Sequence, residues 1–123
     1  MPIDFTSVRG QVRLLTSDVD ETNLVLSDEM IDGYLQLHAG RAGQIRRAAA
    51  DALDAIATSE ALIGKVMRTA DGRSTDGAKV ADALRKHAAG LRTEADAQDE
   101  DAAWSDDGAF GVTEFAPYPR SLL

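Results

Sequence analysis

The stretch QIRRAAADALDAIATSEALIGKVM, residues 44–67, decides the fold. Its large apolar residues recur at spacings of three, four and seven, the period of a helix with one buried face. Alanines fill the positions between them, and alanine has the highest helix propensity and lets a neighbouring helix approach closely. Thr58-Ser59-Glu60 is placed to cap a fresh start, and Gly64 costs about 1 kcal/mol relative to alanine inside a helix. We predict a helix over about 42–60 and leave 61–67 open between helix and strand.

Two shorter helices are predicted before this one. Residues 4–15 place Phe5, Val8, Val12 and Leu15 at helical spacing, with Asp4 or Thr6 as the N-cap and Gly10 as a weak point. Ser27 is a good N-cap for a second helix of about ten residues that ends at Gly40. Its apolar face consists of Met30, Ile31, Tyr34, Leu35 and His38. Residues 16–26 between these helices read as a loop.

A second long helix is predicted over about 76–99, after the turn dipeptide Asp71-Gly72. We expect it to end near Asp99, because acidic residues are unfavourable at the C-terminal end of a helix dipole. The fold class is therefore all-α: a small bundle of about four helices whose two long members pair antiparallel. A short hairpin at about 61–75 is also allowed. The predicted core consists of Ile45, Leu53, Ile56, Val80, Leu84 and Leu91.

The charge of the chain is uneven. The 123 residues carry a net charge of −8, of which residues 93–123 hold −7, from eight acidic residues and one basic residue. The nearly neutral remainder lacks the clustered Lys and Arg that gripping of nucleic acid requires. The absence of cysteine excludes disulfides and thiolate chemistry. We also expect no signal peptide and no membrane-spanning helix, because no long apolar run occurs.

The last twenty residues combine acids, Gly and Pro with four of the six aromatic residues. Disordered tails are usually poor in aromatics. We therefore divide the chain into a helical domain, 1–101, and an extended acidic and aromatic tail, 102–123, that becomes ordered on a partner. Docking of the tail onto its own helices is the alternative. The tail residues expected to bind a partner are Trp104, Phe110, Val112, Phe115 and Tyr118.

One acidic loop has part of the spacing of a calcium-binding loop. Asp18, Asp20, Thr22 and Glu29 occupy positions one, three, five and twelve of such a loop. Against this reading, Asn23 stands where the loop requires glycine, and a helix start explains Glu29 more simply. A solvated acidic loop is the favoured interpretation.

No pattern of an enzyme is found. His38 and His87 have no partner at ligand spacing, and no nucleophile elbow or phosphate-binding glycine loop occurs. We therefore expect no catalytic residue, no cofactor and no required metal. Arg46 and Arg47 are interpreted as a solvated helix face and as candidates for ion pairs between subunits.

The order of blocks resembles a known family. LSDEMIDGYLQL, RRAAADALDAIATSEALIGKVMRT and STDGAKVADALRKHAAGLR are similar to blocks of the head-to-tail connector (adaptor) proteins of long-tailed bacteriophages, over roughly residues 7–97. The resemblance implies a virion protein of the neck, assembled in the host cytoplasm, that forms a dodecameric ring beneath the portal protein. It also implies that the ring extends the DNA channel, through which DNA passes without specific binding, and docks the next tail-connecting protein. The C-terminal segment of such proteins reaches the portal, often as an added strand.

A further loop is assigned on this basis. We expect Arg68, Asp71, Arg73 and Asp76 to face the channel lumen or a neighbouring ring. Two other functions remain open. One is a calcium-responsive binding module built on residues 18–29, and the other is a small helical regulatory partner that binds a single heteropartner.

Overall fold

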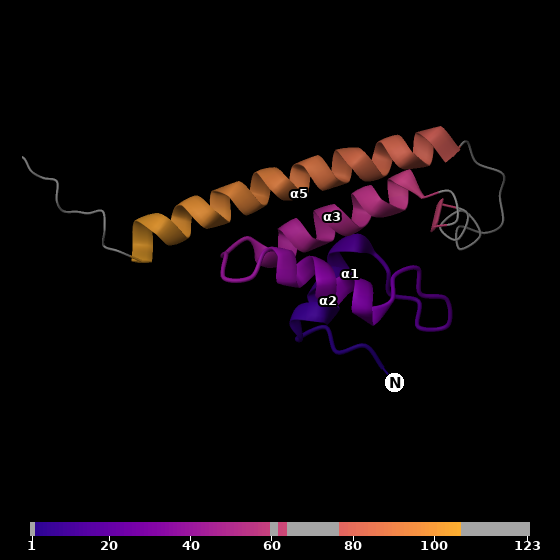
Figure 1. Ribbon diagram of the computed structural model, residues 1–123, viewed down its shortest axis with the longest axis horizontal. Helices are drawn as coiled ribbons and strands as arrows, with labels where there is room; N and C mark the ends of the chain where they lie inside the picture. Colours follow the sequence, from indigo (N-terminus) through magenta and orange to yellow (C-terminus); the bar gives the residue numbers. More distant parts are fainter. Residues whose placement is uncertain (1, 60–61, 64–76, 107–123) are drawn as a thin grey trace, which may run out of the picture.

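The computed structural model describes residues 2–59, 62–63 and 77–106, and every regular element in these ranges is a helix. The elements are α1 (Val8–Thr16), α2 (Asp28–Leu37), α3 (Gln44–Thr58) and α5 (Gly77–Asp106). Figure 1 shows three layers, with α5 on one side of α3 and the short helices α1 and α2 on the other. The predicted all-α bundle is confirmed, and the alanine-rich helix α3 forms its middle layer.

Helix α1 begins later than expected. Its N-cap is Ser7, whose hydroxyl accepts a hydrogen bond from the Gly10 N–H at 3.0 Å. The predicted caps Asp4 and Thr6 instead form the turn before it, where the Asp4 carboxylate accepts from the Thr6 N–H at 2.9 Å. A Cβ on Gly10 would collide with the Asp4 carbonyl. Gly10 is therefore a site of close backbone approach as well as a weak helix former.

The apolar face predicted for α1 is partly wrong. Val12 is fully buried, but Phe5 and Val8 are 39% and 46% exposed. The buried residues of α1 are Gly10, Val12 and Arg13, so its inner face is rotated toward a charged side chain. The pairing of Arg13 described below explains this rotation.

Helix α2 agrees with its prediction. The Ser27 hydroxyl accepts from the Met30 N–H at 3.1 Å, and Asp28 and Glu29 occupy the first turn. The helix ends at Leu37, and Gly40 has a φ of +85°, a conformation that favours glycine. The chain thus reverses at this joint and enters α3.

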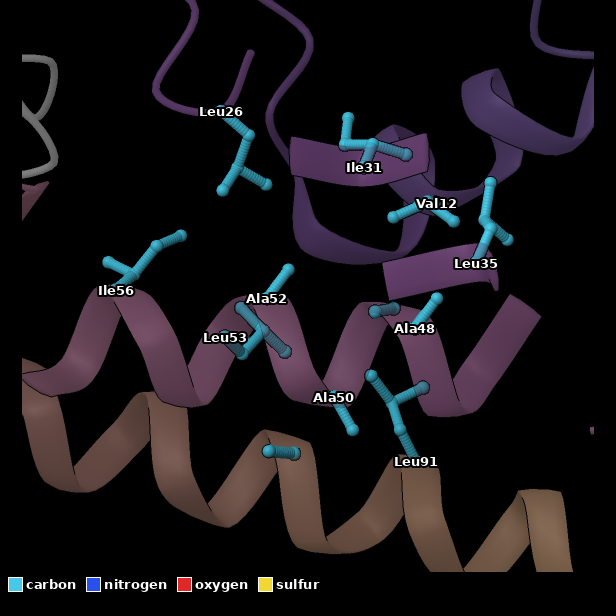
Figure 2. Close-up of a cluster of buried hydrophobic side chains, with 12 residues drawn as sticks. Val12, Leu26, Ile31, Leu35, Ala48, Ala50, Ala52, Leu53, Ile56 and Leu91 are labelled. Atoms are coloured by element: carbon cyan, nitrogen blue, oxygen red, sulfur yellow. The ribbon is translucent and has the colours of Figure 1, made fainter. Parts of the chain in front are cut away.

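Helix α3 is buried along two of its sides. Figure 2 shows Ala48, Ala52 and Ile56 directed toward α1, α2 and the loop between them, while Ala50 lies between α3 and α5 beside Leu91. Leu53 and Ile56 are 1% and 2% exposed. The small side chains of α3 let helices pack closely on both of its sides.

The predicted core is confirmed in its central part. Leu53, Ile56 and Leu91 are buried, whereas Ile45 and Leu84 are half-buried against them. Val80 is partly exposed, and Ala81 and Ala88 are the buried residues of α5 near it. The inner stripe of α5 is therefore made largely of alanine.

The long helices α3 and α5 pair antiparallel, as predicted. At one end of the pair, an added Cβ on Gly43, the N-cap of α3, would stand 2.8 Å from the Cβ of Ala95. From there the contacts run in opposite directions, from Arg46 beside Glu94 to Ala57 near Arg85. This order fixes the register of the two helices.

Helix α5 is longer than predicted and continues to Asp106, across the boundary placed at residues 101 and 102. Asp99 does not end it, because its carboxylate accepts hydrogen bonds from the Gly43 N–H at 2.8 Å and from Arg47 at 2.7 Å. An acidic side chain held in this way lies inside the helix rather than at its end, and Ala102 and Ala103 then favour continuation. Trp104 is consequently a helical residue.

The segment after α3 is described only in part. The Ser59 hydroxyl accepts from the Leu62 N–H at 3.3 Å, so Ser59 is the capping residue within the predicted group Thr58-Ser59-Glu60. Leu62 and Ile63 have helical backbone. The rest of the hairpin allowed at about 61–75 lies outside the described residues.

Candidate functional site

An ion pair is buried between α1 and the loop that follows it. Arg13 Nη1 lies 2.8 Å from Asp18 Oδ2, and the two side chains are 2% and 4% exposed. The second terminal nitrogen of Arg13 lies 2.7 Å from the Asp28 carboxylate at the start of α2. Arg13 thus joins α1, the loop and α2. Helical periodicity assigns no such role to Arg13, because its partners come from segments that meet only in the fold.

The same Asp18 organises the loop of residues 17–27. Its Oδ1 accepts from the Val25 N–H at 2.9 Å, and its Oδ2 accepts from the Leu26 N–H at 2.9 Å. Ser17 starts the loop in the left-handed region, with a φ of 61°. Every oxygen of this buried carboxylate therefore has a donor within the chain, as burial of a charge requires.

The calcium-loop arrangement is not formed. The Asp18 carboxylate is occupied by Arg13 and two backbone N–H groups. Asp20 accepts from the Thr22 N–H and hydroxyl at 3.0 and 2.7 Å, and Glu29 lies in the first turn of α2. Within the part of the chain that the structure describes, no three His, Asp or Glu side chains gather as a metal site. The spacing of a calcium loop is thus explained by a loop stapled at Asp18.

A row of ion pairs connects α3 with α5. Arg46 lies 2.9 Å from Glu94, and Arg47 lies 2.7 Å from Asp99. The guanidinium of Arg47 and the Gly43 N–H hold the pKa of Asp99 below its ordinary value. Arg47 is only 14% exposed, so its interpretation as a solvated face is wrong. Because the small side chains of α3 let α5 approach closely, both arginines pair with acids of their own chain, and these pairs explain them without a contact between subunits.

A second polar cluster lies on the same pair of helices, around Asp51. Its two oxygens lie 2.7 Å from His38 Nε2 and 2.9 Å from Arg92, and Arg92 also reaches Asp54 at 2.7 Å. Burial raises the pKa of the nearby Tyr34, and the charge of Asp51 adds to this shift. His38, on the apolar face of α2, is therefore a partly buried histidine whose partner is the Asp51 carboxylate.

A hollow lies between the loop of residues 17–27, α3 and α5, and we call it the groove. Its volume is about 420 Å³, and its lining is mostly apolar. Leu53 and Ile56 of α3 form its floor. Ala83, Leu84 and His87 of α5 form one wall. The end of α1 and the loop form the other wall, which consists of Thr16, Ser17, Asp18, Val19, Asp20, Asn23 and Val25. His87 Nε2 lies 2.9 Å from the Leu15 carbonyl, which fixes the wall of α5 to the end of α1.

The projecting end of α5, residues 100–106, extends past the start of α3. Asp99 already lies opposite Gly43, so the seven residues that follow continue for about 10 Å at 1.5 Å per residue. Figure 1 shows this end of α5 running beyond the other helices. Trp104 is 63% exposed on it, and Glu100 and Asp101 are exposed one turn earlier. The end combines a large aromatic side chain with negative charge.

Several predicted site residues lie outside the described ranges. They are the tail residues Phe110, Val112, Phe115 and Tyr118 and the loop residues Arg68, Asp71, Arg73 and Asp76. Of the predicted tail set, the structure places Trp104 alone. The site features that sequence patterns missed are Arg13 and the groove, both of which join segments distant in sequence.

Comparison with known proteins gave no match: no family model, no curated protein and no solved structure corresponds to the chain. A membrane span was also sought, and none of the described helices has the length and apolar character needed to cross a bilayer.

Proposed function

We propose that this chain is a structural subunit, the head-to-tail connector of a long-tailed bacteriophage, which assembles as a ring beneath the portal. The proposal places it in the neck of the virion, after assembly in the host cytoplasm, with the ring extending the DNA channel. Support comes first from the order of sequence blocks that resemble this family, since those blocks correspond to α2, α3 and α5.

The observation that carries the proposal is the length of α5 and its projecting aromatic end. This helix of 30 residues is about 45 Å long, twice the length of α3, and its last two turns continue past the bundle. Trp104 is 63% exposed on this end, and tryptophan is among the residues most enriched at the energetic centres of protein–protein interfaces. A rigid body with a projecting aromatic end is suited to contact neighbours in an assembly.

The charge of the chain fits this role as well. Residues outside the acidic C-terminal quarter carry a net charge near −1, and the arginines of α3 are held by acids of α5. A channel wall that bound phosphates strongly would retard the passage of DNA. A nearly neutral subunit leaves DNA free to slide.

The direct test is assembly with a portal ring. The purified full chain is mixed with portal rings, sedimented, and imaged at low resolution; we expect co-sedimentation and a ring under the portal. Deletion of residues 108–123 is expected to abolish binding to the portal while leaving the helical body folded, as judged by its helical circular dichroism. A truncated chain that still binds would refute the role of the tail, and a full chain that never co-sediments would refute the connector function.

The loop at 68–76 gives a second test of the same function. If it faces the lumen or a neighbouring ring, replacing both Asp71 and Asp76 by Lys should impair retention or ejection of DNA. The measurement is infectivity of phage carrying the double variant, and unchanged infectivity would sink the assignment.

A small helical regulatory protein is the other function open to this fold. It predicts a monomer or dimer bound tightly to a single heteropartner, which sedimentation of the purified chain distinguishes from a ring. A calcium-responsive module is disfavoured by the engaged carboxylate of Asp18. A calorimetric titration without heat at millimolar calcium would dispose of it.

A further inference from the structure

We infer that the projecting end of α5 in one copy of the chain docks into the groove of a second copy, with Trp104 as the inserted side chain. This inference rests on the proposed function for the closure of such contacts into a ring. The pair contact itself follows from the shape, the charge and the length of α5.

The groove is of the right kind for one large aromatic side chain. Its volume of about 420 Å³ lies within the range of about 300–1,000 Å³ that small-molecule pockets occupy. Leu53, Ile56 and Leu84 give it an apolar interior, and Val19, 43% exposed, stands at its edge. Insertion of a tryptophan would bury about 150–250 Å² of its surface there.

The charges beside the groove are complementary to those of the projecting end. Lys79 and Lys86 are exposed on α5 and lie four residues before and three residues after Ala83, so they share its side of the helix. Glu100 and Asp101 lie four and three residues before Trp104 and share its side in the same way. Two carboxylates would thus approach two ammonium groups as the indole enters.

The acids that line the groove reduce this attraction only in part. Asp18 is neutralised by Arg13 at 2.8 Å and is buried. Asp20 is exposed, and its carboxylate accepts from the backbone and the side chain of Thr22. Asp82 lies three residues after Lys79 and four before Lys86, so it offsets part of their charge, and its carboxylate lies 3.9 Å from Arg85. Beside the groove, the exposed basic side chains of Lys79, Arg85 and Lys86 face the exposed carboxylates of Asp20 and Asp82, which leaves an excess of positive charge.

Trp104 cannot reach the groove of its own chain through α5. From Ala83 to Trp104 the helix advances 21 residues, which is about 30 Å at 1.5 Å per residue. The projecting end and the groove wall are held apart on one continuous helix. A groove occupied by Trp104 therefore requires the projecting end of a second copy. Such a contact joins two different surfaces of identical subunits, and repetition of it generates a ring where the rotation closes and a filament where it does not.

The experiment uses the full chain and its single tryptophan, Trp104. We expect the indole emission to shift to the blue as protein concentration rises, in parallel with an increasing sedimentation coefficient, and the shift to weaken at high salt. Trp104→Ala is expected to weaken self-association about 30-fold or more, which is typical of an interfacial hot spot. Leu37→Ala is the matched control, since Leu37 is an aliphatic side chain, 72% exposed on α2, and should leave association unchanged.

A mixing experiment tests the two-surface geometry. Ala83→Glu places a carboxylate in the wall of the groove at an exposed position, where the fold tolerates it. Each variant alone should be monomeric, and an equimolar mixture of Trp104→Ala with Ala83→Glu should form dimers only, because one intact end and one intact groove remain. The emission of the Ala83→Glu tryptophan should shift to the blue only in that mixture.

Different results separate the inference from the function on which it rests. Rings that co-sediment with the portal but show unshifted emission and full assembly of Trp104→Ala would overturn the inference and leave the connector function standing. Association that depends on Trp104 but never leads to binding of a portal would refute the connector function and support the contact between copies. Loss of association on deleting residues 108–123, with Trp104→Ala unaffected, would identify the tail as the occupant and overturn the inference.

Discussion

The two ionic regions of this molecule are built from the same residue types in opposite surroundings. The pair Arg13–Asp18 is 2% and 4% exposed and joins α1 to a loop. The pair Arg46–Glu94 is 34% and 60% exposed and lies at the rim between α3 and α5. Removing charges from water costs several kcal/mol per ion, a cost that exposed pairs avoid. A buried pair is therefore tolerated only where further hydrogen bonds complete it.

The difference in exposure indicates what each ionic region contributes. Asp18 accepts hydrogen bonds from Arg13, Val25 and Leu26, and these bonds define a single loop conformation that forms one wall of the groove. The exposed pairs between α3 and α5, such as Arg46–Glu94, add little energy each, but their order matches one antiparallel register. We interpret the buried pair as essential to the fold and the exposed pairs as aids to register.

The largest effect is expected at Asp18. Asp18→Ala leaves the guanidinium of Arg13 buried and deprives the Val25 and Leu26 N–H groups of their acceptor, so the free energy of unfolding should fall by about 3–5 kcal/mol. Urea denaturation measures the change. Asp20→Ala in the same loop is the control, and it should cost far less because its carboxylate is exposed. Equal losses at both positions would mean that the loop does not depend on the buried pair.

The apolar contact between the helices provides a reference for both ionic regions. Leu53→Ala should lower the free energy of unfolding by about 2–5 kcal/mol, because Leu53 is 1% exposed and a cavity would remain. Leu84 is half-buried at the groove, so Leu84→Ala should cost less. Thermal and urea unfolding of the two variants would give the ranking, and a loss under 1 kcal/mol at Leu53 would show that the assignment of the faces of α3 is wrong.

The helices of this fold were predictable where local signals decide them. Ser27 caps α2 through its own hydroxyl, and the alanines of α3 favour a helix irrespective of what surrounds them. The end of α5 was not predictable in this way. Acids near Asp99 are unfavourable to an isolated helix end, yet Gly43 and Arg47, more than fifty residues earlier, donate to Asp99 and let the helix continue.

The candidate site was predictable to a smaller extent, for the same reason. Arg13 follows the buried Val12, and arginine is a residue type that usually lies on the surface. Its burial is explained only by the ion pair with Asp18 of the following loop. The groove requires three segments that are distant in sequence. The placement of an aromatic residue among acids predicts that Trp104 binds a partner, and this stays a prediction, whereas the helical conformation of Trp104 was missed.

A pH dependence should report on the ion pair between Arg47 and Asp99, which lies between the two extremes with 14% and 23% exposed side chains. Hydrogen bonds from Arg47 and the Gly43 N–H hold the pKa of Asp99 below its ordinary value of 3.8. A carboxyl whose pKa is lower in the folded chain stabilises the fold fully above its ordinary value and loses that contribution as pH falls through the folded pKa. Stability from Asp99 should therefore be constant from pH 7 to about pH 5 and decline below about pH 4. Asp99→Asn should reduce the fall in the free energy of unfolding below about pH 4, measured by urea denaturation at each pH. An unchanged fall would assign the acid sensitivity to other carboxylates.

The smallest effect is expected at Glu94, the exposed partner of Arg46. Glu94→Gln retains the length of the side chain and removes its charge, so the free energy of unfolding should fall by only about 0.2–1 kcal/mol. The loss should vanish at high salt, because water and ions screen a pair that is 34% and 60% exposed. A double-mutant cycle with Arg46→Gln isolates the interaction between the two side chains from their other contacts. If the coupling exceeded about 2 kcal/mol and persisted at high salt, the distinction between the two ionic regions would fail, since an exposed pair would then hold the helices as strongly as a buried one.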